Sequence, residues 1–220
     1  MRVFVAGATG AIGRPLVPKL VAAGHEVTGM TRSEKRAEGV RAAGARAVVC
    51  DAFDADAVRS AVGEAGAEAV AHQLTALPDR IDFRDKELYT ATNRLRSEGT
   101  SILLAAAREG GARRFVCQSI AFAYAPAGER VMSEEAPLMK NLPGNFGEGV
   151  RVIAEMERQG SKPRAWTAWS CATASSTARA PTTGRTARPP GTCAAAGCRW
   201  LVAAPASSPS STLTTPPTPP

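Results

Sequence analysis

The chain has 220 residues and a formal net charge of +7, a length that suits one medium-sized domain or one domain with an appendage. A chain of this length buries roughly 70% of its unfolded surface, so it needs no disulfide or metal ion to hold a core. No run of about 18 apolar residues is present, which predicts no membrane span. The five cysteines lack metal-binding spacing, which favours a reduced, cytoplasmic setting and no metal site.

The first two thirds of the chain alternate short apolar runs with helical patterns. Short apolar runs predict strands, and apolar residues spaced by three and four predict helices. Strands are expected over 2–6, 26–30, 46–50, part of 67–74 and 113–120, and helices over about 11–23, 33–43, 55–65, 90–109 and 147–158. This alternation predicts an α/β fold, a doubly wound Rossmann-type parallel sheet with right-handed crossovers, truncated after about five strands.

A glycine-rich turn, Gly7-Ala8-Thr9-Gly10-Ala11-Ile12-Gly13, separates the first strand from the first helix. Gly7 would permit the tight turn, Gly10 would let backbone N–H groups approach a pyrophosphate, and Gly13 would let the helix pack close to the strand. The phosphate would then meet the positive end of the helix. In the first strand–turn–helix of an alternating chain this spacing indicates a dinucleotide site, and a tight turn without a nucleotide is the alternative. The residues expected to bind the cofactor here are Gly7, Thr9, Gly10, Ala11, Ile12 and Gly13.

This turn and several later segments resemble the extended and atypical short-chain dehydrogenase/reductase family, which includes NAD-dependent epimerases and dehydratases. The resemblance covers residues 1 to about 158. It implies a Rossmann fold, NAD or NADP as cofactor, and a Ser/Thr–Tyr–Lys catalytic set. The implied activity is that of an oxidoreductase or epimerase/dehydratase acting on a small carbonyl, hydroxyl or sugar-nucleotide substrate.

Three further segments carry the resemblance. Asp51 follows the third strand, where the family's Asp touches the adenine amine; a helix N-cap is the equally favoured alternative, and both roles can hold. Residues 70–76 resemble the end of the family's fourth strand, which implies that Leu74 and Thr75 line the cofactor, while His72 is read as structural rather than catalytic. Asn93 with Gly99-Thr100 resembles the family's Asn–Gly–Thr helix, at a stretched spacing.

The end of the second strand favours NADP(H) over NAD. NAD enzymes of this type place an acidic residue there to hold the ribose hydroxyls. This chain instead has Met30-Thr31-Arg32-Ser33, with Lys35 and Arg36 close by. A guanidinium can pair bidentately with a 2′-phosphate, so Arg32 is the expected contact. An exposed basic start of a helix, with no role in binding, is the alternative.

The expected catalytic set is incomplete. Ser119, at the end of the segment that resembles the family's fifth strand, fits the family's Ser, whose role would be to hydrogen-bond a substrate oxygen. Neither tyrosine is followed four residues later by Lys, and a soft alignment puts Phe146 and Val150 where the family has its Tyr and Lys. Tyr124 is the candidate substitute for the missing Tyr, and a loop aromatic over the cofactor is the alternative.

The composition changes sharply near the end of the chain. All 20 acidic residues lie at or before Glu157, whereas the 55 residues from Trp166 onward hold four Arg, no acid, and 39 Ala, Thr, Ser or Pro. Such a segment is expected to form neither a core strand nor an amphipathic helix. Back-translation in a shifted frame can yield two family-like motifs in order, so we divide the chain into a Rossmann domain, 1–158, and an out-of-frame tail, 159–220. A genuine disordered tail is the alternative.

Two classes of function follow. One is an NAD(P)-dependent enzyme of the kind described above; the other is a non-catalytic NADP-binding sensor or scaffold, which the missing Tyr–Lys pair favours. Because four of the seven net positive charges lie in the segment from Trp166 onward, and no basic stripe with aromatics is present, we expect no nucleic-acid partner. The helices at 90–109 and 147–158 could form the family's homodimer contact.

Overall fold

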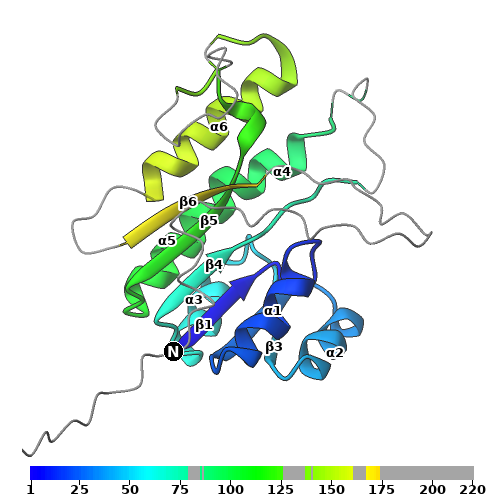
Figure 1. Cartoon of the computed structure of the whole chain (residues 1–220), viewed down its shortest axis with the longest axis vertical. Coiled ribbons are helices and arrows are strands. Elements are labelled where there is room, and N and C mark those ends of the chain that lie inside the picture. The colour runs from blue at the N-terminus through cyan, green and yellow to red at the C-terminus, as the bar shows by residue number, and fades with distance from the viewer. Residues whose placement is uncertain (79–84, 86, 126–136, 140, 161–166, 174–220) are drawn as a thin grey trace, which may run out of the picture.

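A parallel sheet of six strands forms the centre of the computed structural model (Figure 1). The structure describes residues 1–78, 85, 87–125, 137–139, 141–160 and 167–173. The strands, in the order β3-β2-β1-β4-β5-β6, are β1 (Arg2–Ala6), β2 (Glu26–Thr31), β3 (Arg46–Val49), β4 (Ala69–His72), β5 (Arg114–Ile120) and β6 (Thr167–Thr173). The order reverses between β1 and β4, which is where doubly wound folds bind their ligands.

Helices cover both faces of this sheet. They are α1 (Gly13–Ala22), α2 (Glu34–Ala42), α3 (Ala55–Glu64), α4 (Thr90–Arg94), α5 (Thr100–Glu109) and α6 (Gly144–Gly160). The apolar core is accordingly split in two: α1 and α2 pack with one cluster of sheet residues, and α3, α5 and α6 pack with the other. The doubly wound Rossmann-type fold predicted from the sequence is confirmed, and five of the strands and all the expected helices lie within a few residues of their predicted bounds.

The sheet extends one strand beyond the expected five. β6 pairs in parallel with β5 along its whole length, with Arg114 opposite Thr167 and Ile120 opposite Thr173. The expectation that the segment from Trp166 onward contributes no strand is therefore corrected for residues 167–173. The physical reason is that β5 would otherwise present an unpaired row of N–H and C=O groups. Any backbone can complete such a row, and Thr and Trp residues favour the extended conformation.

The long helix expected over 90–109 is interrupted by a π-helical turn. This turn, η1 (Leu95–Gly99), lies between α4 and α5, and all three run as one continuous helical stretch. A π turn holds one more residue than an α turn, and such turns occur frequently at functional sites. It lies within the family-like segment that runs from Asn93 to Thr100.

Candidate functional site

The glycine loop is held against the end of β4 so closely that no side chain fits. Gly7 has φ +88°, and a Cβ placed there would lie 2.6 Å from the carbonyl oxygen of Gln73. A Cβ on Gly13 would lie 2.1 Å from the carbonyl oxygen of Gly7. Gly10 closes the turn by donating its N–H to the Gly7 carbonyl at 3.0 Å. The roles expected of Gly7 and Gly13 in the turn and in helix packing thus have a direct geometric basis.

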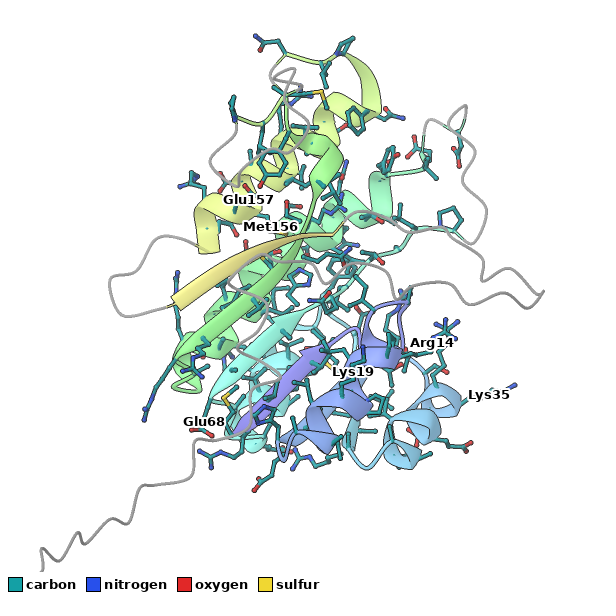
Figure 2. The ribbon with its side chains drawn as sticks, in the orientation of Figure 1. Arg14, Lys19, Lys35, Glu68, Met156 and Glu157 are labelled. Carbon is teal, nitrogen blue, oxygen red and sulfur yellow. The ribbon has the colours of Figure 1, made fainter. Side chains whose placement is uncertain are left out.

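The amino end of α1 is open toward this loop. Its N-cap residue, Ile12, provides no side-chain hydrogen bond, and its first turn contains no acidic residue. The free N–H groups at such an end carry a partial positive charge and suit an anion. The exposed side chain of Arg14 adds a full positive charge in the first turn (Figure 2). The loop and helix therefore form a cradle whose shape and charge fit a dinucleotide pyrophosphate.

Two threonines tie this loop to the end of β2. Oγ1 of Thr9 lies 3.2 Å from Oγ1 of Thr31, the last residue of β2, and the N–H of Ser33 points at the same Thr31 oxygen at 3.4 Å. Arg32 follows Thr31 and is exposed. The first turn of α2 contains Glu34, whose carboxylate is held by Arg41 at 2.8 Å. Arg32 is thus free to approach a group bound beside the loop.

Asp51 lies in the turn after β3 and is exposed. Its carboxylate accepts the N–H of Phe53 at 3.0 Å. The N-cap of α3 is Asp54, which accepts the N–H of Ala57 at 3.0 Å. The N-cap alternative for Asp51 is therefore corrected: Asp54 is the residue with the dihedral angles and spacing of a cap. The adenine role of Asp51 stays a prediction.

The end of β4 passes directly beside the glycine loop. Leu74 is half-buried against the main core cluster, and Thr75 is exposed. Both follow Gln73, whose N–H bonds to the carbonyl of Ala6 at 2.8 Å and whose own carbonyl contacts Gly7. This segment therefore lies next to the cradle, where the sequence placed its cofactor-lining residues.

His72 is part of the interior rather than of the reacting surface. Its Nδ1 accepts the N–H of Leu74 at 3.2 Å, and its Nε2 lies 3.0 Å from Oγ1 of Thr100. Because Nδ1 accepts, the ring proton lies on Nε2 and is donated to Thr100. Burial, aided by the charge of Arg96, lowers the pKa of His72 from 6.5 to about 4. The neutral ring joins the segment after β4 to the helix through its contacts with Leu74 and Thr100. This agrees with the expectation that His72 is structural rather than catalytic.

Ser119 is completely buried and bonded to a carboxylate. Its hydroxyl donates to Oε1 of Glu157 at 2.6 Å, and Glu157 lies on α6 beside Met156 (Figure 2). Residues alternate along β5, so Ser119 shares the buried face with Phe115 and Cys117. Burial first, and the charge of Glu157 second, raise the pKa of Cys117 to about 12. In this structure Ser119 joins β5 to α6.

We expect Ser119→Ala to lower the free energy of unfolding by about 1–3 kcal/mol, because the carboxylate loses a buried, charge-assisted hydrogen bond. Urea unfolding followed by circular dichroism measures the change. Ser60→Ala is the control, since Ser60 is exposed on α3. A Ser119→Ala variant as stable as the Ser60→Ala variant would contradict the joining role.

The place of the family's Tyr–Lys pair is filled by apolar packing. Val150 is buried with Ala123 and Ile153, and Phe146 packs half-buried against the same cluster. Neither side chain can donate a proton. Tyr124 is half-buried after the short 3-10 turn η2 (Ala121–Ala123) and forms an isolated bridge to Leu138. Its role as a substitute acid stays a prediction.

Two polar residues beside the π turn are buried, which was not predicted from the sequence. Arg96 is 4% exposed and Asn93 is 7% exposed. Oδ1 of Asn93 is the one fully enclosed side-chain N or O atom without a hydrogen-bond partner among the described residues, and it faces Gly149 of α6. Asn93 was noticed for its family resemblance only. The signal for Arg96 was weak, because a basic residue between Leu95 and Ser97 also suits an exposed helix face.

The family of the protein follows from a match to a family model described as NAD(P)H-binding, which covers residues 7–158. The chain belongs to this NAD(P)H-binding family. The matched region contains the whole cradle and the strands β2 to β5 that surround it. The prediction of an NAD(P)-binding Rossmann domain is confirmed.

Two curated relatives are reductases by name. The chain is 52% identical, over 161 residues, to a 3-diazoavenalumate denitrifying reductase from a Streptomyces species; the match covers 72% of this chain and 51% of the relative. It is 33% identical, over 140 residues, to a 4-hydroxy-2-methyl-3-oxo-4-farnesyl-3,4-dihydroquinoline-1-oxide ketoreductase from Stigmatella aurantiaca, which covers 64% of this chain and 37% of the relative. The chain is thus similar, over part of its length, to two proteins that are named as reductases.

Two of the solved structures with the same fold are named as UDP-glucose 4-epimerases. A UDP-glucose 4-epimerase from Stenotrophomonas maltophila, with bound NAD and formylated UDP-arabinopyranose, superposes with a TM-score of 0.64 at 19% identity; the match covers 77% of this chain and 52% of that one. A UDP-glucose 4-epimerase from Thermus thermophilus, in complex with NAD, gives 0.56 at 25% identity over 72% and 49% of the two chains. The chain spans about half the length of these proteins and of the Streptomyces reductase.

Two kinds of feature are absent from the described residues. No helix among them is long and apolar enough to cross a membrane. No three His, Cys, Asp or Glu side chains in the same part of the chain are close enough to hold a metal ion.

Proposed function

We propose that the chain is the cofactor-binding part of a cytoplasmic NAD(P)H-dependent reductase that acts on a small carbonyl- or hydroxyl-bearing substrate or a sugar nucleotide. The observation that carries the proposal is the cradle, where a Cβ on Gly7 or Gly13 would collide with backbone beside an uncapped helix end. NAD(P)H, when bound, supplies a hydride. The reductase names of the two curated relatives support this direction of reaction.

The residues proposed to hold the cofactor lie around the cradle. The backbone of the loop and the start of α1 would take the pyrophosphate. Asp51 would accept the adenine amine, and Leu74 and Thr75 would line the nicotinamide half. NADP(H) is the favoured form, because Arg32 is exposed beside Thr31 and Thr9 and can pair with a 2′-phosphate.

Arg32→Ala should weaken NADPH binding by about ten-fold or more, because a charge-assisted hydrogen bond is lost, and leave NADH binding unchanged. Isothermal titration calorimetry with both nucleotides measures this. Arg113→Ala is the control, since Arg113 is an exposed arginine just before β5, at the opposite end of the sheet. Equal losses for NADPH and NADH would refute the 2′-phosphate role.

Turnover is proposed to depend on groups other than a Tyr–Lys pair. Ser119 and Tyr124 are the candidate catalytic residues from the sequence, with Tyr124 as the proton donor to a substrate oxygen. The second candidate function, a non-catalytic NADP-binding sensor or scaffold, is favoured by the apolar packing of Phe146 and Val150. NADPH oxidation with a panel of small aldehydes and ketones separates the two: NADPH binding without oxidation supports the sensor.

The domain division is also a proposal. The family match ends at residue 158, and the acidic residues end at Glu157, which supports an out-of-frame reading of 159–220. Sequencing the gene across codons 150–220 tests it. A register change that yields the two family-like motifs supports it, and the printed frame without a change overturns it. A homodimer through α4, α5 and α6 is proposed as well, and sedimentation velocity tests it.

A further inference from the structure

The side chain of Arg96 is buried and has no counterion among the residues that the structure describes. The side chain is 4% exposed, and none of the ion pairs formed by the described residues includes it. Burial lowers the pKa of Arg96. A buried charge without a partner destabilises a folded protein strongly, so its presence calls for a compensating use.

The acidic groups of the same helical stretch are engaged elsewhere. Glu98 binds Arg94 through both carboxylate oxygens, at 2.7 and 3.2 Å. Glu87 accepts the hydroxyl of Thr90 at 2.7 Å. All four side chains are exposed or face solvent, whereas Arg96 faces the interior. Neither of these two described glutamates neutralises the charge of Arg96.

The position of Arg96 is fixed by contacts on either side of it. Thr92 accepts the N–H of Ala76 at 3.0 Å, and Thr100 contacts His72 at 3.0 Å. Arg96 is four residues from each threonine, so it lies on the same face of the helical stretch. It thus faces the segment between His72 and Ala76, which leaves the end of β4 and contains the expected cofactor-lining residues.

A second polar group without a partner lies one turn away. Oδ1 of Asn93 is enclosed and unbonded, and an ideal Cβ on Gly149 would lie 3.6 Å from it. Asn93 and Arg96 flank the start of the π turn, which begins at Leu95. A buried arginine beside an enclosed amide oxygen that has no hydrogen-bond partner points to a functional site, because π turns occur frequently at such sites.

We propose that Arg96 binds an oxyanion, the carboxylate or phosphate group of a small-molecule ligand, at the carboxyl end of β4. A guanidinium offers two parallel N–H donors to such a group. Among oxyanion sources, a substrate is favoured over the dinucleotide, because the cradle that suits the pyrophosphate lies at Gly7 to Gly13. This inference deepens the proposed function by naming the substrate class, and it rests on that function.

The test uses the full chain and two probes, sodium 4-coumarate as an aryl carboxylate and UDP as a phosphate, with methyl 4-coumarate as the neutral comparison. Calorimetric titrations compare the wild type with Arg96→Met and Arg96→Lys. The control is Arg113→Met, an exposed arginine just before β5 at the opposite end of the sheet. We expect Arg96→Met to weaken binding of at least one anionic probe by ten-fold or more, Arg96→Lys to weaken it less, and Arg113→Met to leave it unchanged.

The thermal midpoint gives an independent readout. Replacing an unpaired buried charge by an apolar side chain should raise the midpoint of Arg96→Met or leave it unchanged. A lower midpoint, or failure of Arg96→Met to fold, would mean that the charge is paired within the protein. Probe binding would then be judged with Arg96→Lys, and unchanged binding in that variant would overturn the proposal. A wild type that binds neither anionic probe overturns it as well.

An NADPH titration of the same variants separates this inference from the function on which it rests. Unchanged NADPH binding in Arg96→Met, with weakened 4-coumarate or UDP binding, assigns the oxyanion to the substrate. Weakened NADPH binding alone assigns it to the dinucleotide. A wild type that binds 4-coumarate through Arg96 but does not bind NADPH would reject the proposed function and keep the anion site.

Discussion

Gly13→Ala should reduce NADPH affinity by at least about 100-fold, which equals roughly 3 kcal/mol of binding free energy. The new Cβ would lie 2.1 Å from the Gly7 carbonyl oxygen and 2.6 Å from the carbonyl carbon of Ala8. These are backbone atoms, so α1 must move away from β1 and the loop must open. The overpacking should also lower the free energy of unfolding by about 1–3 kcal/mol.

Calorimetric titration with NADPH and urea unfolding measure the two effects. Gly39→Ala is the control, because a Cβ there meets nothing within 4 Å and the residue lies within α2. That change should stabilise the protein by about 0.5–1 kcal/mol and leave NADPH binding intact. A Gly13→Ala variant that binds NADPH like the wild type would show that the cradle does not hold the dinucleotide.

Acid should destabilise the protein through His72. Its pKa is lowered from 6.5 to about 4 in the folded state, chiefly by burial. Between these values the unfolded chain binds a proton that the folded chain rejects, so stability is full above about pH 6.5 and is lost as the pH falls toward 4. The expected loss in unfolding free energy between pH 7 and pH 5 is about 2 kcal/mol.

Urea unfolding at pH 7, 6 and 5 measures this loss. His72→Gln should be less stable at pH 7, because the bonds to Thr100 and Leu74 are altered, but its stability should change little between pH 7 and 5. Ser60→Ala, an exposed position on α3, should keep the wild-type pH dependence. If His72→Gln retains the full loss at pH 5, another group is responsible and the assignment to His72 is wrong.

The sequence was most informative where chemistry is local. A tight strand–turn–helix requires glycine where a side chain would collide with the backbone, as at Gly7 and Gly13. The spacing of these glycines was therefore enough to locate the cradle. The buried state of Ser119 could also have been foreseen, since strand residues alternate and Ser119 shares the parity of Phe115 and Cys117. The family resemblance drew attention to its possible catalytic role instead.

Features that depend on packing between distant segments were not predictable. The π turn places Arg96 in the interior, yet its own sequence carries no distinctive signal, because π turns are set by how α4 and α5 pack against the rest of the fold. The unpaired oxygen of Asn93 depends on Gly149, more than 50 residues away. β6 was not predicted because the amino-acid composition reports only on the side chains of this segment. Its pairing with the edge of β5 uses backbone N–H and C=O groups instead.

The most direct test of the account is a calorimetric titration of the purified 220-residue chain with NADPH and with NADH. The account predicts saturable binding of both at one site per chain, tighter for NADPH and abolished for both by Gly13→Ala. Equal affinities would still agree with dinucleotide binding at the cradle, but they would contradict the role of Arg32. The absence of binding by either nucleotide, in a chain that unfolds cooperatively, would contradict the central claim that this fold is a dinucleotide-binding domain.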